Sequence, residues 1–454
     1  MDTEAVLWAT RLAEGADLPD RRLNKRLAAV LGAFASDPAA SIPQAAHDWA
    51  AAKATYRFLE NPRVPEAELL AGVARHAAAD AVLRDVVLVV QDTTSLNFTR
   101  LRSVAELGPI DSAGLGRGLL FHSALALDAD GVVLGLLDLR AWTRPAEGAP
   151  KPDDKESLKW VHGVENARQV LGEAAPGGVM PRLIHVMDRE GDCFDVMLAI
   201  DDAGDGAIIR CAQDRRVLGV AGLARETVRS QPLLGSVVID VPRSHGKATR
   251  RAEVEVRSLK ATLPPDREKY PHGWEVTWNL VEVWERYPPP GEEGLHWLLW
   301  TTEDAETLEA ALAVVKTYRF RWPVEEYHLT LKSGCRVEEL QLESWDGLMK
   351  ALVLYAAVAT RVVRLRDLAR REPETPATRE LSEEECVVLR ARCDPKGKVK
   401  GPLALAQAVL WIGRLGGHLN RKSDGMPGVR TLWKGLRDLA LLVEGFRAAR
   451  SLRK

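Results

Sequence analysis

Several features that define whole classes of protein are missing from this 454-residue sequence. It contains no run of about 18 or more apolar residues, so we expect no membrane-spanning helix. The first residues lack the basic start and apolar core of a signal peptide, and the five cysteines form no CxxC pair. We therefore expect a cytoplasmic protein with neither a structural zinc site nor a disulfide framework.

The common catalytic motifs are missing as well. The glycines form neither a Walker A loop nor a Rossmann fingerprint, and the sequence has no GxSxG and no HExxH. These absences argue against the usual nucleotide-binding proteins, serine hydrolases and zinc proteases. What remains is a chain whose composition, 46% hydrophobic and 28% charged, is that of a globular protein. Its length predicts two or three domains.

The formal net charge of −2 gives no support for nucleic-acid binding, but the charge is unevenly distributed. Residues 395–454 hold 13 Lys and Arg against 3 Asp and Glu, a net of +10, which leaves −12 for the rest of the chain. A basic C-terminal region favours a polyanionic partner. A helical tail with merely solvated charges would have the same composition.

The two ends of the chain are predicted to be helical. Near the N-terminus, one amphipathic helix follows Asp20 and a second runs from Ile42 through Phe58, before the stop signal Asn61-Pro62. Near the C-terminus, residues 346–370 and 430–452 have helical periodicity, with a linker at 371–381. The last helix carries an apolar stripe that requires a partner, either a second copy or its own domain.

Between the ends, two short apolar runs each finish at an aspartate. Residues 86–91 precede Asp92, and residues 183–187 precede Asp188, so both are predicted to follow buried strands. The carboxyl ends of such strands are where α/β sheets place their chemistry. Two alternatives stay open: Asp92 as a turn-capping residue, and Asp192 in the role of Asp188.

The stretch from Lys316 to Lys332 carries an unusual set of polar residues. On a helical wheel, Tyr318, Arg321, Glu325 and Lys332 fall within an arc of roughly 60°. A phosphodiester-processing site needs this mixture, because a carboxylate holds a metal while cations and a hydroxyl hold the phosphate backbone. Pro323 is expected to begin the helix and to push Trp322 out of α conformation.

The spacing Tyr-x2-Arg-x3-Glu-x6-Lys, within the text RWPVEEYHLTLKSG, resembles the YREK signature of bacterial insertion-sequence transposases. These are DDE enzymes that cut and paste DNA through a hairpin intermediate. The resemblance extends from about residue 4 to 450 and includes TYRFLENPRV and RLGGHLNRKSDGMPGVRTLWKGL. It implies an α/β fold with an RNase H-like catalytic core at 71–373, a β insertion at about 204–300, a helical DNA-end-binding domain at 1–70 and a helical basic C-terminal domain at 374–454 for dimerisation and DNA contact.

The same resemblance assigns roles to individual residues. Asp92, Asp188 and Glu325 would be the catalytic carboxylates, holding two Mg²⁺ or Mn²⁺ ions. The adjacent Glu326 is expected to face elsewhere, so that Glu326→Gln is mild and Glu325→Gln fatal. The remaining candidates are DNA contacts: Tyr318, Arg321, Lys332, Arg210, Trp297, Arg26 and Arg57.

For several of these contacts the sequence also allows a purely structural role. Trp297 would stack on a base extruded at the hairpin, or it packs in the core of a strand. Arg210 belongs to a basic inserted region that either follows a phosphate backbone or is simply solvated. Arg26 and Arg57 are as compatible with salt bridges between helices as with DNA contacts.

The expected partners are terminal inverted repeats and target DNA, bound by a homodimer in a synaptic complex in the bacterial cytoplasm, associated with the nucleoid. Two other functions fit the same residues. One is an RNase H-like endonuclease without strand transfer, and the other is an inactive DNA-binding relic of a transposase.

Overall fold

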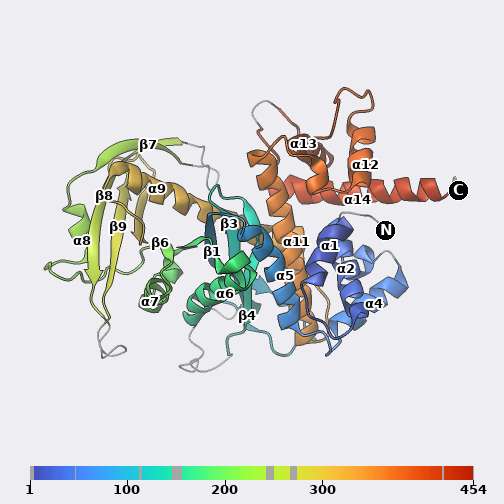
Figure 1. The fold of residues 1–454 in the computed structure, drawn as a ribbon, viewed down its shortest axis with the longest axis horizontal. Helices are drawn as coiled ribbons and strands as arrows, with labels where there is room; N and C mark the ends of the chain where they lie inside the picture. Colours follow the sequence, from blue (N-terminus) through green and yellow to red (C-terminus); the bar gives the residue numbers. More distant parts are fainter. Residues whose placement is uncertain are drawn as a thin grey trace.

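The computed structural model describes residues 5–46, 48–111, 115–145, 156–241, 250–265, 274–421 and 424–452. A ten-stranded mixed sheet forms its centre, with helices on both faces and helical regions at both ends of the chain (Figure 1). This is the mixed α/β architecture that the sequence predicts. Within the described residues, no helix is long and apolar enough to cross a membrane.

Five strands form the RNase H-like part of the sheet, in the order β4-β3-β1-β5-β6. The strand β3 is antiparallel to both β1 and β4, whereas β5 and β6 run parallel to β1. The hairpin between β3 and β4 turns at 128–131, where Gly131 has φ +83. The bounds are β1 (Val86–Asn97), β3 (Arg117–Asp128), β4 (Val133–Trp142), β5 (Arg182–Met187) and β6 (Gly206–Arg210), with the two-residue β2 (Gly108–Pro109) beside β3.

The inserted strands continue this sheet rather than forming a separate unit. The strand β10 pairs antiparallel with β6, and β9, β8 and β7 follow in turn. Because β6 pairs in parallel with β5, it is a strand of the core, and the insertion begins after Arg210 rather than near residue 204. The added elements are α8 (Ala224–Arg229), β7 (Gly235–Val241), β8 (Arg250–Leu263), β9 (Val276–Trp284) and β10 (His296–Thr301).

The N-terminal region is helical, as predicted, but one predicted helix is divided. Asp48 breaks the expected Ile42–Phe58 helix, because its carboxylate accepts a hydrogen bond from Ala51 N at 2.7 Å and so caps a new helix. Asp20 caps the preceding helix through Arg22 N at 2.9 Å. The helices are α1 (Ala5–Glu14), α2 (Arg21–Ser36), α3 (Ile42–Ala45) and α4 (Trp49–Leu59).

Alternation along the strands assigns their side chains to two different helical layers. Val87 and Val89 of β1 pack with α5 (Glu66–Ala81) and α6 (Leu158–Ala174). Leu88 and Val90 point to the opposite face, into the large core that includes α10 (Trp322–Leu329) and α11 (Trp345–Arg371). The remaining layer helices are α7 (Phe194–Ala203), which packs on the α6 face, and α9 (Leu308–Tyr318).

The C-terminal region has its own core, built from the end of α11 and three further helices. The predicted apolar stripe of the last helix packs into this core through Leu432, Leu436, Leu439 and Val443, so its first partner is its own domain. The helices are α12 (Glu383–Cys393), α13 (Leu405–Leu415) and α14 (Val429–Ser451).

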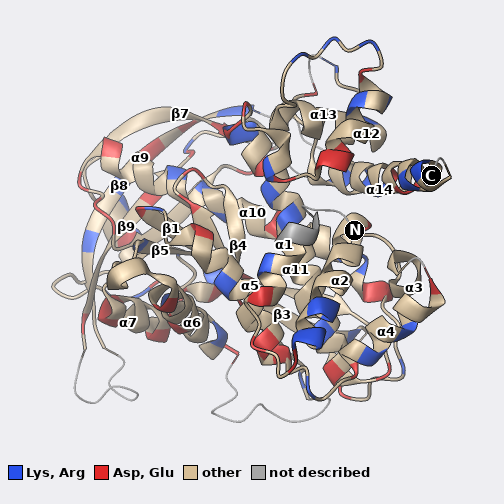
Figure 2. Ribbon diagram, turned by 45° about the vertical axis from the view of Figure 1, so that its right-hand side comes forward, with Lys and Arg blue, Asp and Glu red and all other residues tan. Residues whose placement is uncertain are grey.

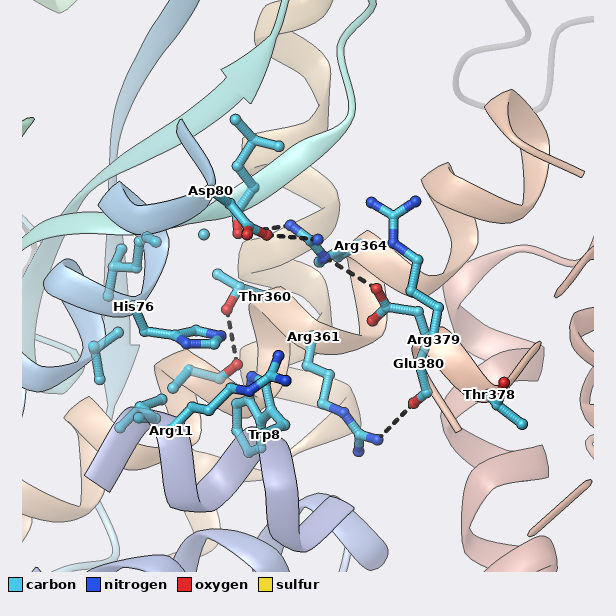
Figure 3. A pocket seen from close by; sticks show the side chains of 17 residues that line it. Trp8, Arg11, His76, Asp80, Thr360, Arg361, Arg364, Thr378, Arg379 and Glu380 are labelled. Atoms are coloured by element: carbon cyan, nitrogen blue, oxygen red, sulfur yellow. Dashed lines mark hydrogen bonds and ion pairs between the residues drawn. The ribbon is translucent and has the colours of Figure 1, made fainter. Parts of the chain in front are cut away.

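A cavity of about 340 Å³ lies where the N-terminal helices, the sheet and the C-terminal region meet. Arg364 of α11 holds its walls together (Figure 3): it pairs with Asp80 of α5 at 2.7 Å and donates to Leu134 O of β4 at 3.1 Å. The same guanidinium lies 3.4 Å from the Glu380 carboxylate, and Arg361 donates to Glu380 O at 3.0 Å. Arg361 also lies over the Trp8 ring of α1, 5.4 Å from its centroid, so α11 contacts all three parts of the chain.

A buried ion cluster fixes α10 against α11. The Arg366 side chain, 2% exposed, pairs with Glu326 of α10 and with its neighbour Asp367. Removing one member of a buried pair leaves an uncompensated charge, which is more harmful than the pair is favourable.

We therefore expect Arg366→Ala to lower the free energy of unfolding by about 3–5 kcal/mol. Urea denaturation monitored by circular dichroism measures this. The control is Arg371→Ala on the same helix. That side chain is exposed and, within the described part of the chain, contacts only the Phe320 ring, so the expected change is about 1 kcal/mol or less. Equal losses for the two variants would contradict the buried-cluster assignment.

Candidate functional site

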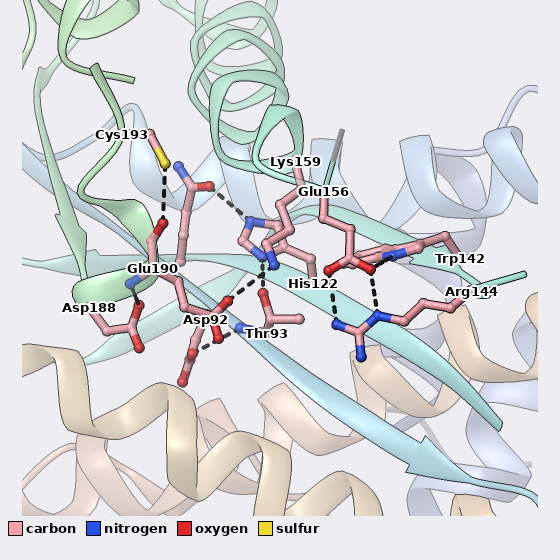
Figure 4. A network of polar contacts seen from close by, with 11 residues as sticks. Asp92, Thr93, His122, Trp142, Arg144, Glu156, Lys159, Asp188, Glu190 and Cys193 are labelled. Atoms are coloured by element: carbon pink, nitrogen blue, oxygen red, sulfur yellow. Dashed lines mark hydrogen bonds and ion pairs between the residues drawn. The ribbon is translucent and has the colours of Figure 1, made fainter. Parts of the chain in front are cut away.

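Asp92 and Asp188 point to the same face of the sheet, from neighbouring parallel strands. Val90 pairs with Val186 in register, and each aspartate lies two positions further along its strand direction. Side chains two residues apart on a strand share a face, and Val90 and Val186 both pack into the core with α10 and α11. The two aspartates consequently lie next to each other (Figure 4).

The position of Asp92 differs in one respect from the prediction. We expected it just past the end of its strand, but β1 continues to Asn97 because β3 pairs with it along its whole length. The parallel partner β5 stops at Met187. Asp92 thus lies inside β1, beyond the last residue that pairs with β5, and Asp188 directly follows β5 as predicted.

Tyr318, Arg321 and Glu325 lie on a continuous helical path. The helix α9 ends at Tyr318, a 3₁₀ turn covers 319–321, and α10 begins at Trp322 with Pro323 in its first turn. The expectation that Pro323 pushes Trp322 out of α conformation is wrong, since Trp322 has φ −58 and ψ −36. Proline is accepted here because the preceding 3₁₀ turn already places Trp322 in helical geometry.

Arg321 lies between two of the three carboxylates. Its Nη1 is 3.3 Å from Asp92 Oδ2, and its Nη2 donates to Glu325 Oε1. Burial lowers the pKa of Arg321, but Asp92, Tyr318 and Glu325 more than offset this, so that the pKa is raised overall. The guanidinium therefore remains charged and joins the sheet to α10.

The carboxylates carry more negative charge than Arg321 neutralises. Burial raises the pKa of Asp92 to about 7; Arg321 opposes the rise, and Asp188 and Glu325 add to it. Carboxylate oxygens are the ligands that Mg²⁺ and Mn²⁺ prefer, so the donor set fits these cations in kind. In the described part of the chain, however, no three His, Cys, Asp or Glu side chains are spaced to hold a metal ion. Binding of a cation to both Asp92 and Glu325 requires Arg321 to release one of them.

Two residues of the inserted region join this site. The Arg210 guanidinium, at the end of β6, lies near the Tyr318 side chain, and burial lowers the pKa of Arg210. Trp297 of β10 packs edge-on against Tyr318, with ring centroids 5.7 Å apart. Tyr318 itself is only 5% exposed, and burial raises its pKa. The structure thus brings Arg210, Trp297 and Tyr318 together beside Arg321.

Lys332 is further from the carboxylates than the helical wheel suggests. It lies half-buried in a π-helical turn, Thr330–Gly334, that follows α10. Burial lowers its pKa, and the carboxylate that opposes this is Glu338, not one of the three. Glu338 accepts a hydrogen bond from Asn97 N at the end of β1, at 2.7 Å. Lys332 therefore lies toward the end of β1.

Arg26 and Arg57 lie apart from this cluster, on α2 and α4 of the N-terminal region. Both side chains are exposed, and neither forms an ion pair with any residue that the structure describes. Arg26 shares α2 with three more exposed cations, Arg21, Arg22 and Lys25, which give this helix a basic side (Figure 2). The salt-bridge alternative therefore has no support among the described residues.

Asp192, the alternative to Asp188, is committed to a structural role. Its buried carboxylate accepts hydrogen bonds from Ala212 N at 2.7 Å, from Gln213 N at 2.8 Å and from Arg215 at 2.7 Å. These bonds fix the chain that leaves β6. Among the described residues, Asp188 accepts one hydrogen bond, from Glu190 N at 2.8 Å.

A polar network behind the sheet was not predicted from sequence. Gln91 and Thr93 flank Asp92 and point to the opposite face, where both hydrogen-bond His122, at 3.0 and 2.9 Å (Figure 4). Burial lowers the pKa of His122 well below its usual value, which keeps the ring neutral. Lys159 of α6 pairs with Glu190 at 3.1 Å and so supports the turn after Asp188. These residues come from distant parts of the sequence, which carries no local signal for them.

Trp322 is a second residue that sequence reasoning missed. It is 58% exposed, directly after Arg321. We considered it only as the residue before Pro323, although a large exposed aromatic side chain beside a candidate site is itself a signal for stacking.

We expect Asp92→Asn to stabilise the protein in EDTA at pH 8. A carboxyl with a pKa of about 7 when folded, against the ordinary 3.8, disfavours the folded state once it ionises. The gain should be about 2–4 kcal/mol at pH 8 and should vanish as the pH falls from about 7 toward 4. Urea denaturation at several pH values measures it. A variant no more stable than the original chain at pH 8 would contradict the assignment.

The two aspartates near residue 190 should respond differently to substitution. Asp192→Asn breaks a buried, fully bonded ion pair and should lower the free energy of unfolding by about 3–5 kcal/mol. Asp188→Asn, which removes a charge from a crowded site, should leave the protein at least as stable as before. Thermal and urea denaturation of both variants give the comparison, and the reverse order of stability would show that the roles are exchanged.

Both ends of the chain match families of known transposase domains. Residues 5–64 match the family described as "Transposase DNA-binding", and residues 357–454 match "Transposase Tn5 dimerisation domain". The carboxylate site lies between the two matches. The two ends of the chain are therefore similar to a transposase DNA-binding domain and to a Tn5 transposase dimerisation domain.

Proposed function

We propose that the chain is a cut-and-paste DNA transposase of the DDE type, with Asp92, Asp188 and Glu325 as its catalytic carboxylates. The observation that carries the proposal is their convergence. Asp92 and Asp188 extend from adjacent strands, and Arg321 links Asp92 to Glu325. This convergence lies in a chain whose two ends match transposase domains.

The three carboxylates are suited to hold two Mg²⁺ or Mn²⁺ ions, which when bound would activate the attacking oxygen and stabilise the leaving 3′-oxygen. Asp92 takes part in its ionised form, because a carboxyl group loses its proton when it binds a metal ion. Arg321, once released from a carboxylate, is placed to bind a phosphate oxygen. Arg210 and the Tyr318 hydroxyl would bind the same backbone from the side of the inserted strands.

Two aromatic side chains suit the sharp bend of a DNA hairpin, which extrudes a base. Trp297 is partly buried, with its ring packed edge-on against Tyr318, whereas the Trp322 side chain is 58% exposed. Bases stack on aromatic rings without regard to sequence. We assign Trp297 to the base platform, as the family resemblance implies, and add Trp322 as a second stacking surface next to Arg321.

The remaining candidate residues would contact DNA outside the carboxylate site. Arg26 and Arg57 in the N-terminal region would contact the terminal inverted repeats, and Lys332 would hold a phosphate near the end of β1. The cleaved ends would pass through a hairpin and then join target DNA, with two copies of the chain in the synaptic complex.

The test uses a plasmid that carries the short inverted repeats flanking the source reading frame. Purified protein with Mg²⁺ should release hairpin-ended DNA, and Asp188→Ala and Glu325→Gln should each reduce the excision rate by about 10³-fold or more. Gel electrophoresis under denaturing conditions distinguishes hairpin ends from open ends.

Glu326→Gln is the matched control, since it changes the neighbouring carboxylate on the same helix. It should retain excision near the original rate per folded molecule, although it loses an ion pair with the buried Arg366 and so lowers stability. Comparable rate losses for Glu325→Gln and Glu326→Gln would contradict the triad. Cleavage without preference for the repeats would indicate a nuclease, and specific binding without cleavage a relic.

A further inference from the structure

Lys332 lies in a turn whose geometry differs from that of an α-helix. Residues Thr330–Gly334 form a π-helical turn, in which Cys335 N donates to Thr330 O at 2.8 Å, five residues back. Turns of this kind occur mostly as single turns within helices, frequently at functional sites. Because the backbone of the turn sets the direction of the side chain at 332, whatever holds the turn in place also places Lys332.

Trp433 of α14 packs directly on this turn. A Cβ atom added to Gly334 would lie only 2.8 Å from Cε3 and 3.0 Å from Cδ2 of Trp433, so the indole ring is in contact with the glycine backbone. Trp433 is 7% exposed. Real Cβ atoms do not approach heavy atoms this closely, so the contact exists only because residue 334 is glycine.

Trp433 belongs to a different hydrophobic core from the buried residues that follow it on α14. Together with Val429 it belongs to the large core that contains β1, α10 and the turn itself. The later residues Leu436 and Leu439 belong to the separate C-terminal core. The start of α14 is therefore packed into the catalytic domain, while the rest of the helix extends away toward the C-terminus (Figure 1).

We propose that Trp433 is a positioning residue, which fixes the π-turn and thereby makes the placement of Lys332 depend on the position of α14. The inference rests on the proposed function, in which Lys332 binds a phosphate group. Residues 357–454, which include α14, match a dimerisation domain. Docking of a second copy on the exposed part of α14, where Leu441 is 59% exposed, would then act on the lysine through one side chain.

A double-mutant cycle on the full chain tests this, with terminal-repeat DNA and Mg²⁺. Trp433→Ala should lower the cleavage rate at saturating DNA by about tenfold to a hundredfold, since small misplacements of a positioning group have effects of that size. Its affinity for the repeats, measured by gel shift, should change by no more than about twofold. With Lys332→Ala already present, Trp433→Ala should reduce the residual rate by less than about twofold, because the residue that it positions is gone.

Two further variants separate positioning from loss of folding. Gly334→Ala leaves the C-terminal core intact but pushes the turn away from Trp433, and it should show the same dependence on Lys332. Leu439→Ala removes a fully buried side chain from the same helix without touching the turn. If Leu439→Ala lowers the cleavage rate, it should do so by the same factor in the original chain and in the Lys332→Ala variant.

The outcomes distinguish this inference from the function on which it rests. If Trp433→Ala and Gly334→Ala reduce the rate equally in both backgrounds, or not at all, Trp433 does not act through Lys332, and the transposase assignment is unaffected. If Lys332→Ala alone cleaves at the original rate, the phosphate-binding role of Lys332 fails, and the role of Trp433 fails with it.

Discussion

The arrangement of the site depends on the two ion pairs that the Arg321 guanidinium forms with Asp92 and Glu325. Asp92, Asp188 and Glu325 bring three like charges to one partly buried place, and such charges repel unless a cation lies among them. Arg321 supplies that cation from the same helical segment that carries Glu325. In the proposed function a metal ion would compete with the guanidinium for the same carboxylates, so the groups that prepare the site would have to rearrange for catalysis.

Neighbouring glutamates on α10 divide two tasks between them. Glu325 points to the sheet and its aspartates, whereas Glu326 pairs with the buried Arg366 of α11. Because consecutive helical residues point about 100° apart, one helix can face the chemistry and be anchored at its back at the same time. A buried ion cluster that does not itself touch the site thus anchors the back of the helix that carries Glu325.

Much of this site follows from local periodicity in the sequence. The repeated pattern of a buried valine followed two residues later by an aspartate, at Val90 and Val186, places both carboxylates on one face of the sheet. Local patterns do not reveal pairings made over long distances. The long antiparallel partner β3 extends β1 past Asp92, and bonds from the chain after β6 occupy Asp192. For the same reason the π-turn, the His122 network and the Glu326–Arg366 pair have no signature in the sequence.

The inserted strands reach the site through sheet pairing alone. β10 lies beside β6, and this places Trp297 near Arg210 although residues 211–295 separate the two strands. The entropy of closing such a loop grows only with the logarithm of its length, about 0.6 kcal/mol for each doubling. The closure entropy alone therefore changes little when this excursion grows or shrinks, provided that β10 returns beside β6. Its strands β8 and β9 have a second role, because they supply buried residues to the core that also contains α7.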